Sequence, residues 1–306
     1  MGTQYHISLV LSKAHSTDSD ELKKKIDNLL QKINQQMSTY IPDSEISHFN
    51  QYKQLSWFSV SDDIAHVVSN AQSISKITSG AFDITIAPLV DLWGFGTKTQ
   101  LSLPLDTQIT LALKEVGYQL LEVRISPPAL RKLNKNLHID LSAIAKGFAV
   151  DKISALLNQE GYKNYLVEIG GEIHLEGKNQ SDKPWLVGIE SPNLLKPTVN
   201  KSLQLSNISL ATSGDYRNYF VKDGIRFSHT INPSTGKPIT HKLASITVLH
   251  ESTMMADAYA TALMVLGENK GKDFAKTHNL KVNMIIRNND SGFSVWKNFD
   301  ETKLVH

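Results

Sequence analysis

Apolar and polar residues alternate near the start of the chain, and the period of the apolar positions then lengthens to that of a helix. Tyr5, Ile7, Leu9 and Leu11 stand at every second position, which predicts a half-buried strand. From residue 22 to residue 33 the apolar positions recur three and four residues apart, which predicts an amphipathic helix. The first two elements are therefore expected to be a strand and then a helix.

The same helical period, together with capping and terminating residues, predicts four more helices. They are a helix from a Ser61 cap to Gly80, a shorter one over residues 106–117, one through residues 149–157 closed by Gly161, and an alanine-rich one over residues 254–266 ended by Gly267. Residues 98–104 lie between the first two and are expected to form a mobile loop.

Extended segments dominate the second half of the chain. Turns rich in Gly, Asn, Asp and Pro separate six expected strands, at residues 165–169, 185–189, 203–205, 245–249, 282–286 and 293–296. One more strand is expected to end near Leu141. Strands and helices mixed without regular alternation favour an α+β fold over a doubly wound sheet. For a chain of 306 residues we expect a single domain, residues 1–306, with two lobes.

Charge and cysteine content exclude several classes of function. Lys and Arg number 32 against 30 Asp and Glu, and no run of like charge occurs, which argues against a nucleic-acid binder. The chain contains no cysteine, so disulfides and thiolate metal sites are excluded. No stretch approaches the roughly 20 apolar residues of a membrane-spanning helix.

Residues 140–151 have the composition of an anion site. They join the end of the strand expected near Leu141 to the start of a helix, with Lys146 expected in its first turn. Free backbone amides and the helix dipole attract a phosphate at such a start, and the lysine adds a full charge. The spacing matches neither the P-loop nor the dinucleotide fingerprint, so the usual nucleotide folds are not indicated.

Asp257 and Thr261 lie four residues apart and therefore share one face of the alanine-rich helix. A carboxylate and a hydroxyl suit Mg²⁺, which takes one or two protein groups and completes its shell with water or phosphates. The pattern equally fits a capping Asp257 near the helix start and a Thr261 hydroxyl satisfied in the core.

Weaker signals occur at four places. His229 precedes a Pro and Gly turn and could accept a proton near neutral pH, or could simply bond a turn carbonyl. Residues 80–85 could form the wall of a pocket for a ligand ring, or a helix end passing into a strand. Tyr40 could stack on a planar heterocycle or pack in the core. Gly170 and Gly171 permit close backbone approach to a ligand or form a bulge.

Read in order, eight motifs resemble the ApbE family, the FAD:protein FMN transferases, over essentially the whole chain. They are Met1-Gly-Thr3, Met37-Ser-Thr-Tyr40 with residues 43–50, Gly80-Ala-Phe-Asp83 running to residue 96, residues 140–151, Glu168-Ile-Gly-Gly171, residues 212–217, residues 229–236, and Ala256-Asp-Ala-Tyr-Ala-Thr261. The resemblance implies an ApbE-like, T-fold-related fold with mixed sheets and flanking helices.

The resemblance also implies an activity and a set of site residues. Members use Mg²⁺ to split FAD, transfer FMN to a Ser or Thr hydroxyl of a protein, and release AMP. His229 would be the base for the acceptor hydroxyl, and Asp257, Thr261 and the carbonyl of Ala143 would hold the metal. The FAD site would be lined by Met1, Tyr40, Ala81, Phe82, Asp83, Asp140, Lys146 and Ile231.

This sequence departs from common family patterns at two positions. Many relatives have an acidic residue where this chain has Ala260, so the metal is expected to have one carboxylate fewer and to bind more weakly. Glu172 stands where an aspartate or a small residue is common, and its role is open.

Tyr40 favours transfer over the hydrolysis of FAD seen in some relatives.

Two alternatives accompany the transferase interpretation: a Mg²⁺-dependent FAD pyrophosphatase that gives free FMN and AMP, and a flavin carrier without turnover. From the family we expect acceptors among the flavoprotein subunits of redox-driven ion pumps. We also expect a periplasmic location, anchored to the bacterial inner membrane as a lipoprotein whose leader is absent from this chain.

Overall fold

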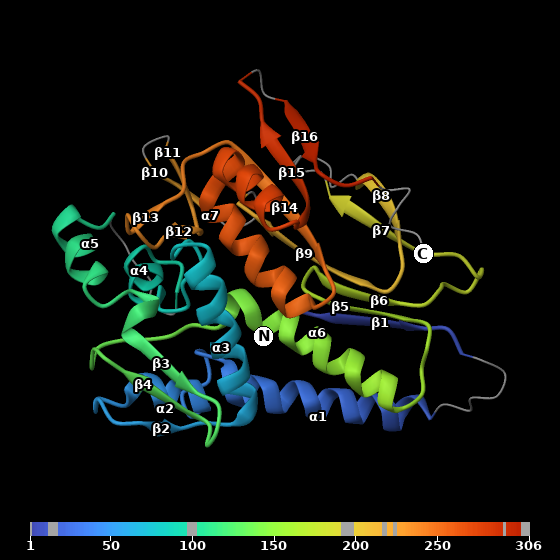
Figure 1. Ribbon diagram of the computed structural model, residues 1–306, viewed down its shortest axis with the longest axis horizontal. Helices are drawn as coiled ribbons and strands as arrows, with labels where there is room; N and C mark the ends of the chain where they lie inside the picture. The colour runs from blue at the N-terminus through green and yellow to red at the C-terminus, as the bar shows by residue number, and fades with distance from the viewer. Residues whose placement is uncertain are drawn as a thin grey trace. The chain divides into compact units, whose positions relative to one another are not determined.

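The computed structural model describes residues 2–11, 18–96, 103–190, 199–215, 219–222, 225–289 and 292–300. The chain forms two compact units (Figure 1). The first comprises residues 1–31, 146–216 and 242–306, and the second comprises residues 32–145 and 217–241. The α+β class expected from the sequence is confirmed, and the single domain stays a prediction.

A seven-stranded sheet forms the centre of the first unit. Its order is β1-β5-β6-β9-β14-β15-β16, and every neighbouring pair is antiparallel. The strands are β1 Tyr5–Leu9, β5 Tyr165–Ile169, β6 Glu172–Glu176, β9 Ile208–Gly214, β14 Leu243–His250, β15 Lys281–Arg287 and β16 Phe293–Lys297. Five of these seven match expected strands, whereas β6 and β9 were not predicted.

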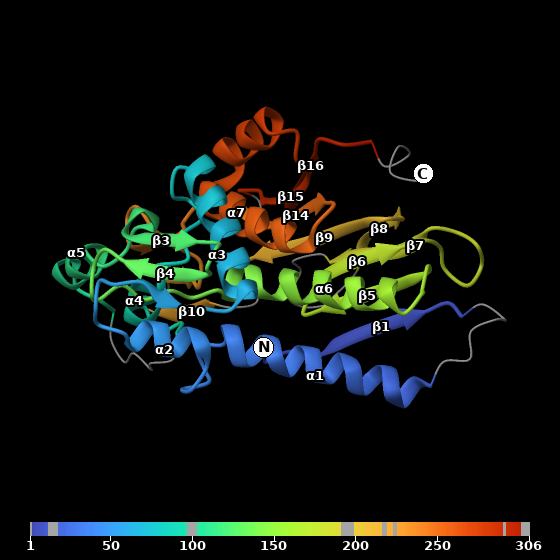
Figure 2. The same ribbon diagram turned by 60° about the horizontal axis from the view of Figure 1, so that its bottom comes forward.

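Three helices belong wholly or partly to the first unit: α1 Ser19–Met37, α6 Ser142–Gln159 and α7 Thr253–Thr277. Figures 1 and 2 show α6 (green) and α7 (orange) side by side along one face of the sheet. The Tyr165 hydroxyl of β5 donates to the Ser154 carbonyl of α6, at 3.2 Å, and α7 packs on β9 and β14. The expected end of this helix at Gly267 is confirmed: the backbone there is not helical, with φ 75°, and a second helical stretch follows it to Thr277.

A hairpin of β7 Trp185–Glu190 and β8 Val199–Leu205 completes the first unit. Its inward side chains, among them Trp185 and Leu205, form one buried cluster with Leu210 of β9 and Leu249 of β14. The hairpin therefore adds a second hydrophobic layer to the large sheet.

The second unit consists of short elements. Its helices are α2 Glu45–Gln51, α3 Asp62–Ile77, α4 Ala87–Leu92, α5 Asp106–Leu113 and the 3₁₀ turn η1 Tyr118–Leu120. Its strands are β2 Phe58–Ser59, β3 Leu121–Arg124, β4 Ala129–Lys132, β10 Tyr219–Lys222, β11 Ile225–Ser228, β12 Ile231–Asn232 and β13 Lys237–Pro238. The predicted Ser61 cap of α3 is confirmed. Most of the expected mobile loop at 98–104 lies outside the described residues.

The strand expected near Leu141 is wrong. Leu137, Ile139 and Leu141 alternate and are fully buried, but the segment does not pair with a strand. The side chain of Asn50 instead donates to the Ile139 carbonyl at 2.9 Å and accepts from the Ile139 amide at 2.8 Å. An asparagine side chain thus takes the place of a neighbouring strand. Residues 83–86 likewise lead into α4 rather than into a strand.

Gly170 and Gly171 form the two-residue turn between β5 and β6, where Ile169 pairs with Glu172. Their φ values of 61° and 102° lie in the region that glycine adopts without strain. The turn explains this glycine pair without a bulge, and it places Glu172 at the first position of β6.

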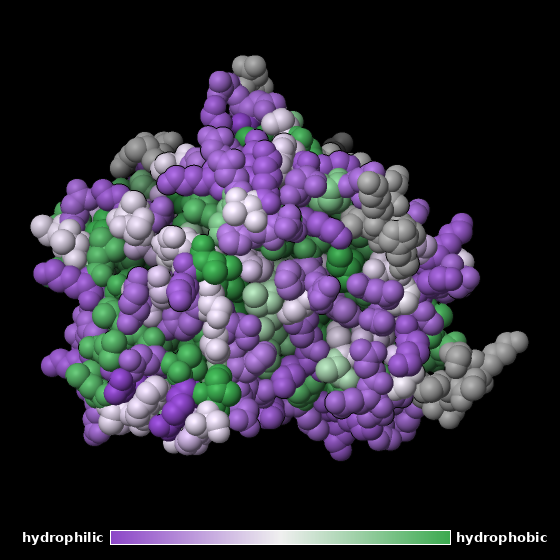
Figure 3. All heavy atoms as spheres, viewed as in Figure 1, coloured by the Kyte–Doolittle hydropathy of each residue, from purple (hydrophilic) through white to green (hydrophobic). Residues whose placement is uncertain are grey.

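Hydrophilic residues predominate on the face shown in Figure 3, and hydrophobic ones come in small groups. Across the described ranges, every helix is too short or too polar to cross a membrane.

Candidate functional site

The backbones of α6 and α7 come close together at Gly147. A Cβ atom at this position would lie 2.4 Å from the Thr253 carbonyl oxygen and 2.7 Å from the Met254 Cα. Only glycine fits there without a shift of the backbone. The close approach brings Lys146 of α6 next to the first turns of α7, where Asp257 lies.

Lys146, Glu172 and Asp257 form what we term the lysine–carboxylate cluster. The Lys146 Nζ atom lies 3.3 Å from Glu172 Oε1 and 3.6 Å from Asp257 Oδ1. Asp257 Oδ2 accepts a hydrogen bond from the Gly147 amide at 3.0 Å. Glu172 and Asp257 are each 3 % exposed, and Glu172 Oε2 has no hydrogen-bond partner among the described residues. Two buried carboxylates therefore share one ammonium group.

Burial and mutual charge shift the pKa values of all three groups. Burial raises the pKa of Glu172, and the neighbouring charge of Asp257 raises it further. Burial also raises the pKa of Asp257, although Lys146 and the Gly147 amide oppose the shift. For Lys146 burial would lower the pKa, but the charges of Asp257 and Glu172 outweigh it and the pKa is raised. The lysine therefore stays an ammonium ion, whereas burial and mutual repulsion disfavour ionisation of both carboxyl groups at once.

Asp151 of α6 fixes the start of α7. Its carboxylate accepts hydrogen bonds from the Ser252 hydroxyl at 2.7 Å, the Thr253 amide at 2.8 Å and the Met254 amide at 3.0 Å. The N-cap of α7 is Ser252. The interpretation of Asp257 as a helix cap is therefore wrong. Its side chain instead contacts Gly147 and Lys146.

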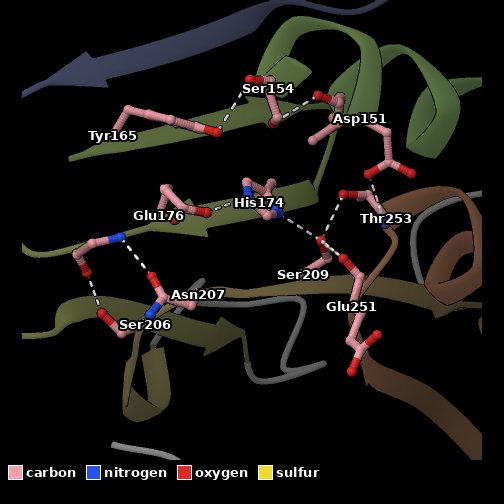
Figure 4. A network of polar contacts seen from close by, with 12 residues as sticks. Asp151, Ser154, Tyr165, His174, Glu176, Ser206, Asn207, Ser209, Glu251 and Thr253 are labelled. Atoms are coloured by element: carbon pink, nitrogen blue, oxygen red, sulfur yellow. Dashed lines mark hydrogen bonds and ion pairs between the residues drawn. The ribbon is translucent and has the colours of Figure 1, made fainter. Parts of the chain in front are cut away.

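A polar network continues behind this junction (Figure 4). The Thr253 hydroxyl donates to Ser209 Oγ at 2.8 Å, and Ser209 Oγ lies 2.8 Å from His174 Nδ1. The other ring nitrogen of His174 lies 3.3 Å from Glu176 Oε2. The network ties the start of α7 to β6 and β9.

Glu176, His174 and Ser209 stand in the order of a carboxylate, an imidazole and a hydroxyl, but they do not form a nucleophilic site. Ser209 is 0 % exposed. Its oxygen also contacts the Thr253 hydroxyl and the Glu251 carbonyl, so no substrate can approach it. The arrangement is a buried structural network.

Thr261 lies one turn beyond Asp257 on the same face of α7, as the sequence predicts. Its hydroxyl lies 3.4 Å from Ser213 Oγ of β9. Ala143 lies in the first turn of α6, and in a regular helix its carbonyl would accept from the Gly147 amide. The Gly147 amide, one helical turn after Ala143, donates a hydrogen bond to Asp257.

These donors suit a magnesium ion. Within the described ranges no group of three or more His, Asp or Glu residues could hold a metal by itself. Mg²⁺ does not need one, because it keeps several waters and takes one or two carboxylates plus phosphate oxygens. The buried Asp257 carboxylate and the Thr261 hydroxyl fit that chemistry.

Three predicted flavin-site residues of the second unit lie between α3 and α4. Phe82 is 1 % exposed, so its ring belongs to the core, whereas Ala81 is half-buried. The Asp83 carboxylate accepts from the Thr85 amide and hydroxyl at 2.8 and 2.6 Å and from the Tyr118 amide at 2.8 Å. Burial raises the pKa of Asp83, and these bonds oppose the shift.

Tyr40 and Asp140 occupy different surroundings in the same unit. Tyr40 is 70 % exposed, so the interpretation that it packs in the core is wrong and its ring is open to stacking. Asp140 donates its amide to the Ile84 carbonyl at 2.7 Å, while its carboxylate accepts from the Ser142 amide at 2.8 Å and so caps α6. Because α6 begins at Ser142, Lys146 is the fifth residue of this helix and lies just beyond its first turn.

His229 and Ile231 flank the short step from β11 to β12. Ile231 is buried beside Leu89 and Trp93. The half-buried His229 ring stands edge-on to Phe95, with centroids 6.3 Å apart. Met1 lies outside the described residues.

The profile of the ApbE family matches residues 1–286 of this sequence. The chain belongs to the ApbE family. Its relatives include the FAD:protein FMN transferase of Vibrio cholerae, 42 % identical over 291 residues that cover 95 % of this chain and 86 % of that protein. The FAD:protein FMN transferase of Haemophilus influenzae is 42 % identical over 313 residues, which cover 99 % of this chain and 90 % of that protein.

Two solved ApbE structures share the fold. The flavin transferase ApbE of Vibrio cholerae has a TM-score of 0.91 and 40 % identity, and the match covers 99 % of this chain and 96 % of that one. The apo flavinyl transferase ApbE of Pseudomonas stutzeri has a TM-score of 0.88 and 35 % identity, covering 98 % and 92 %.

The sequence alone does not indicate a role for three residues near Lys146 and Asp257: Gly147, Asp151 and Glu172. A glycine inside a helix is unfavourable by about 1 kcal/mol, so Gly147 was a signal of close contact. Asp151 and Glu172 carry no comparable signal, because the partners of Asp151 lie 101 to 103 residues further along the chain and Lys146, the partner of Glu172, lies on a helix of another part of the sequence.

Proposed function

We propose that this ApbE-family protein transfers the FMN half of FAD to a serine or threonine hydroxyl of a target protein and releases AMP. It is an enzyme of the FAD:protein FMN transferase kind, the name that its curated relatives carry. The observation that carries the proposal is the lysine–carboxylate cluster, with the Thr261 hydroxyl one turn beyond Asp257. An ammonium group and oxygen ligands of this kind suit a pyrophosphate and its magnesium ion.

The reaction breaks the bond between the phosphorus nearest riboflavin and the oxygen that bridges the two phosphates. A bond forms between that phosphorus and the acceptor oxygen, and AMP leaves with the bridging oxygen. A Mg²⁺ ion bound by Asp257, Thr261 and the Ala143 carbonyl would neutralise charge on the phosphate oxygens. Lys146 binds phosphate from the protein side, because its raised pKa keeps it charged.

Residues of the second unit have the remaining tasks in this proposal. His229 accepts the proton of the acceptor hydroxyl as the new bond forms. The open Tyr40 ring stacks on the isoalloxazine, and Phe82 contributes its main chain because its ring is in the core. Met1, Ala81, Asp83, Asp140 and Ile231 complete the FAD site that the family resemblance implies.

The direct test is a mass measurement on an acceptor. The protein is incubated with FAD, Mg²⁺ and a fragment of a candidate acceptor that contains a threonine. We expect the fragment to gain one FMN group while an equal amount of AMP appears. Steady AMP release without that gain would establish the pyrophosphatase alternative, and no release at all would establish the carrier.

Two variants test the residue roles in the same assay. Asp257→Ala is expected to abolish AMP production, because it removes the central metal ligand. His229→Ala is expected to slow transfer by about 10²- to 10⁴-fold at neutral pH, the usual contribution of a general base. Unchanged AMP production by the first variant, or full transfer by the second, would remove the corresponding role.

We also propose a periplasmic location, with an inner-membrane lipid anchor, and acceptors among flavoprotein subunits of redox-driven ion pumps. Support for both comes from the family alone. Fractionation of cells that express the gene, with lipid labelling of the product, tests the location. A product found only in the cytoplasm and without lipid would contradict it.

A further inference from the structure

Glu172 is the member of the lysine–carboxylate cluster to which the proposed chemistry gives no task. It is buried, it faces Lys146 across 3.3 Å, and one of its oxygens has no hydrogen-bond partner within the described residues. Burying a carboxylate in a protein interior costs free energy unless a group of opposite charge pairs with it. That group is Lys146.

We propose that Glu172 holds the Lys146 ammonium group while Asp257 binds the metal cation, so that the two positive charges do not compete for one carboxylate. Glu172 is then a positioning residue that sets the affinity of the metal site. The inference rests on the proposed function, because it takes Asp257 to be a metal ligand.

The geometry of Asp257 creates the competition. Its Oδ2 atom is occupied by the Gly147 amide at 3.0 Å. Its Oδ1 atom is left for a cation, and this is the atom that Lys146 approaches to 3.6 Å. A metal ion bound to Oδ1 would lie close to the Lys146 ammonium group. Two positive charges this close together repel each other strongly in a buried site.

Glu172 has the capacity to take over the lysine. An ammonium group has three N–H donors, and Glu172 offers Oε1 at 3.3 Å together with the unpartnered Oε2. Its backbone is fixed by pairing with Ile169 directly after the two-glycine turn. Asp151 of α6, a third carboxylate near this junction, already accepts hydrogen bonds from Ser252 and the first amides of α7.

A double-mutant cycle on metal affinity tests the inference. Binding of Mn²⁺, as a probe for Mg²⁺, is measured without FAD from the electron paramagnetic resonance signal of free Mn²⁺, under nitrogen and at slightly alkaline pH. The proteins are the wild type, Glu172→Gln, Lys146→Met and the double variant. Glu168→Gln, on the neighbouring strand, is the matched control and should bind like the wild type.

We expect Glu172→Gln to weaken Mn²⁺ binding by about tenfold, because Lys146 then stays on Asp257. In the Lys146→Met background the same substitution should change affinity by less than about twofold, because the competitor is gone. If the methionine variant does not fold, Lys146→Gln provides the same background.

Two results would overturn the inference and leave the proposed function intact. One is unchanged Mn²⁺ affinity in Glu172→Gln. The other is equal weakening in both backgrounds, which would make Glu172 a metal ligand rather than the partner of Lys146. Absence of Mn²⁺ binding by the wild type would overturn the metal site of the proposed function, and this inference with it.

Discussion

Gly147 leaves no room for a side chain where α6 passes the start of α7. The nearest atoms around its missing Cβ are backbone atoms of Thr253 and Met254, which cannot rotate away. Gly271 of α7 differs, because the nearest atom there is the flexible Cε of Met284 at 3.0 Å. Gly147 and Gly271 therefore lie in similar helices of the same unit but have different surroundings.

Gly147→Ala is expected to destabilise the protein by about 1–3 kcal/mol, the usual cost of overpacking, despite the better helix propensity of alanine. Gly271→Ala, as the control, is expected to be neutral or to stabilise by up to about 1 kcal/mol. Urea unfolding measures both free energies. Equal stability of the two variants would show that the approach at Gly147 tolerates a methyl group.

At the scale of single residues, type and spacing predict site roles for Lys146, Asp257 and Thr261, and these roles stay predictions. The structure brings Lys146 and Asp257 together. The task of Glu172 could not be predicted. Its contact with Lys146 depends on the β5–β6 turn, which places residue 172 at the start of a strand. Local sequence does not encode which helix that strand end will face.

Hydrogen bonds between α6 and α7 run in both directions. Asp257 of α7 accepts from the Gly147 amide of α6, and Asp151 of α6 accepts from the hydroxyl of Ser252 and from the first amides of α7. Each helix therefore fixes the other, and the cluster lies between the two bonds. Rigid helices hold such groups more accurately than loops do.

Asp151→Asn should cost about 1–3 kcal/mol of unfolding free energy, because an amide offers one acceptor oxygen where the carboxylate uses two. Asp18→Asn is the matched control, since Asp18 caps α1 with one oxygen only, toward the amides of Asp20 and Glu21. We expect that control to lose less than about 1 kcal/mol. Thermal unfolding of both variants measures the difference, and equal losses would contradict a special role for Asp151.

Elements with strong apolar patterns were predictable, and those with polar side chains inside were not. β5, β14 and β15 were found because buried apolar residues fill them. β6 and β9 were missed because they carry His174, Ser209 and other polar side chains that the fold satisfies internally. The segment 137–141 alternates like a strand, yet an Asn50 side chain is its partner.

At the scale of the whole molecule, stability should depend on pH through one buried lysine. Lys132 is fully buried in the second unit, and its Nζ donates to the Asn50 carbonyl at 3.0 Å. Burial, and to a smaller degree the charge of Lys53, lowers the pKa of Lys132 from 10.5 to about 8. Between these two values the unfolded chain holds a proton that the folded protein has lost, so stability rises with pH.

The rise expected from Lys132 is at most roughly 3 kcal/mol between pH 8 and pH 10.5. Urea unfolding from neutral pH to pH 10.5 measures it. Lys132→Met should lack this contribution, while Lys76→Met, at an exposed lysine of the same unit, should keep it. Identical pH profiles for the two variants would contradict the assignment.

The pairing of β1 with β5 has a consequence for how the chain is made. Tyr5 pairs with Ile169, so the first strand leaves the ribosome long before its partner exists. Residues 32–145, which make up most of the second unit, are synthesised in between and can fold first. Until then the backbone N–H and C=O groups of the first strand have no partner strand, and such groups can pair with another chain. The chain is therefore most prone to associate with other chains until residues 165–169 are available to pair with the first strand.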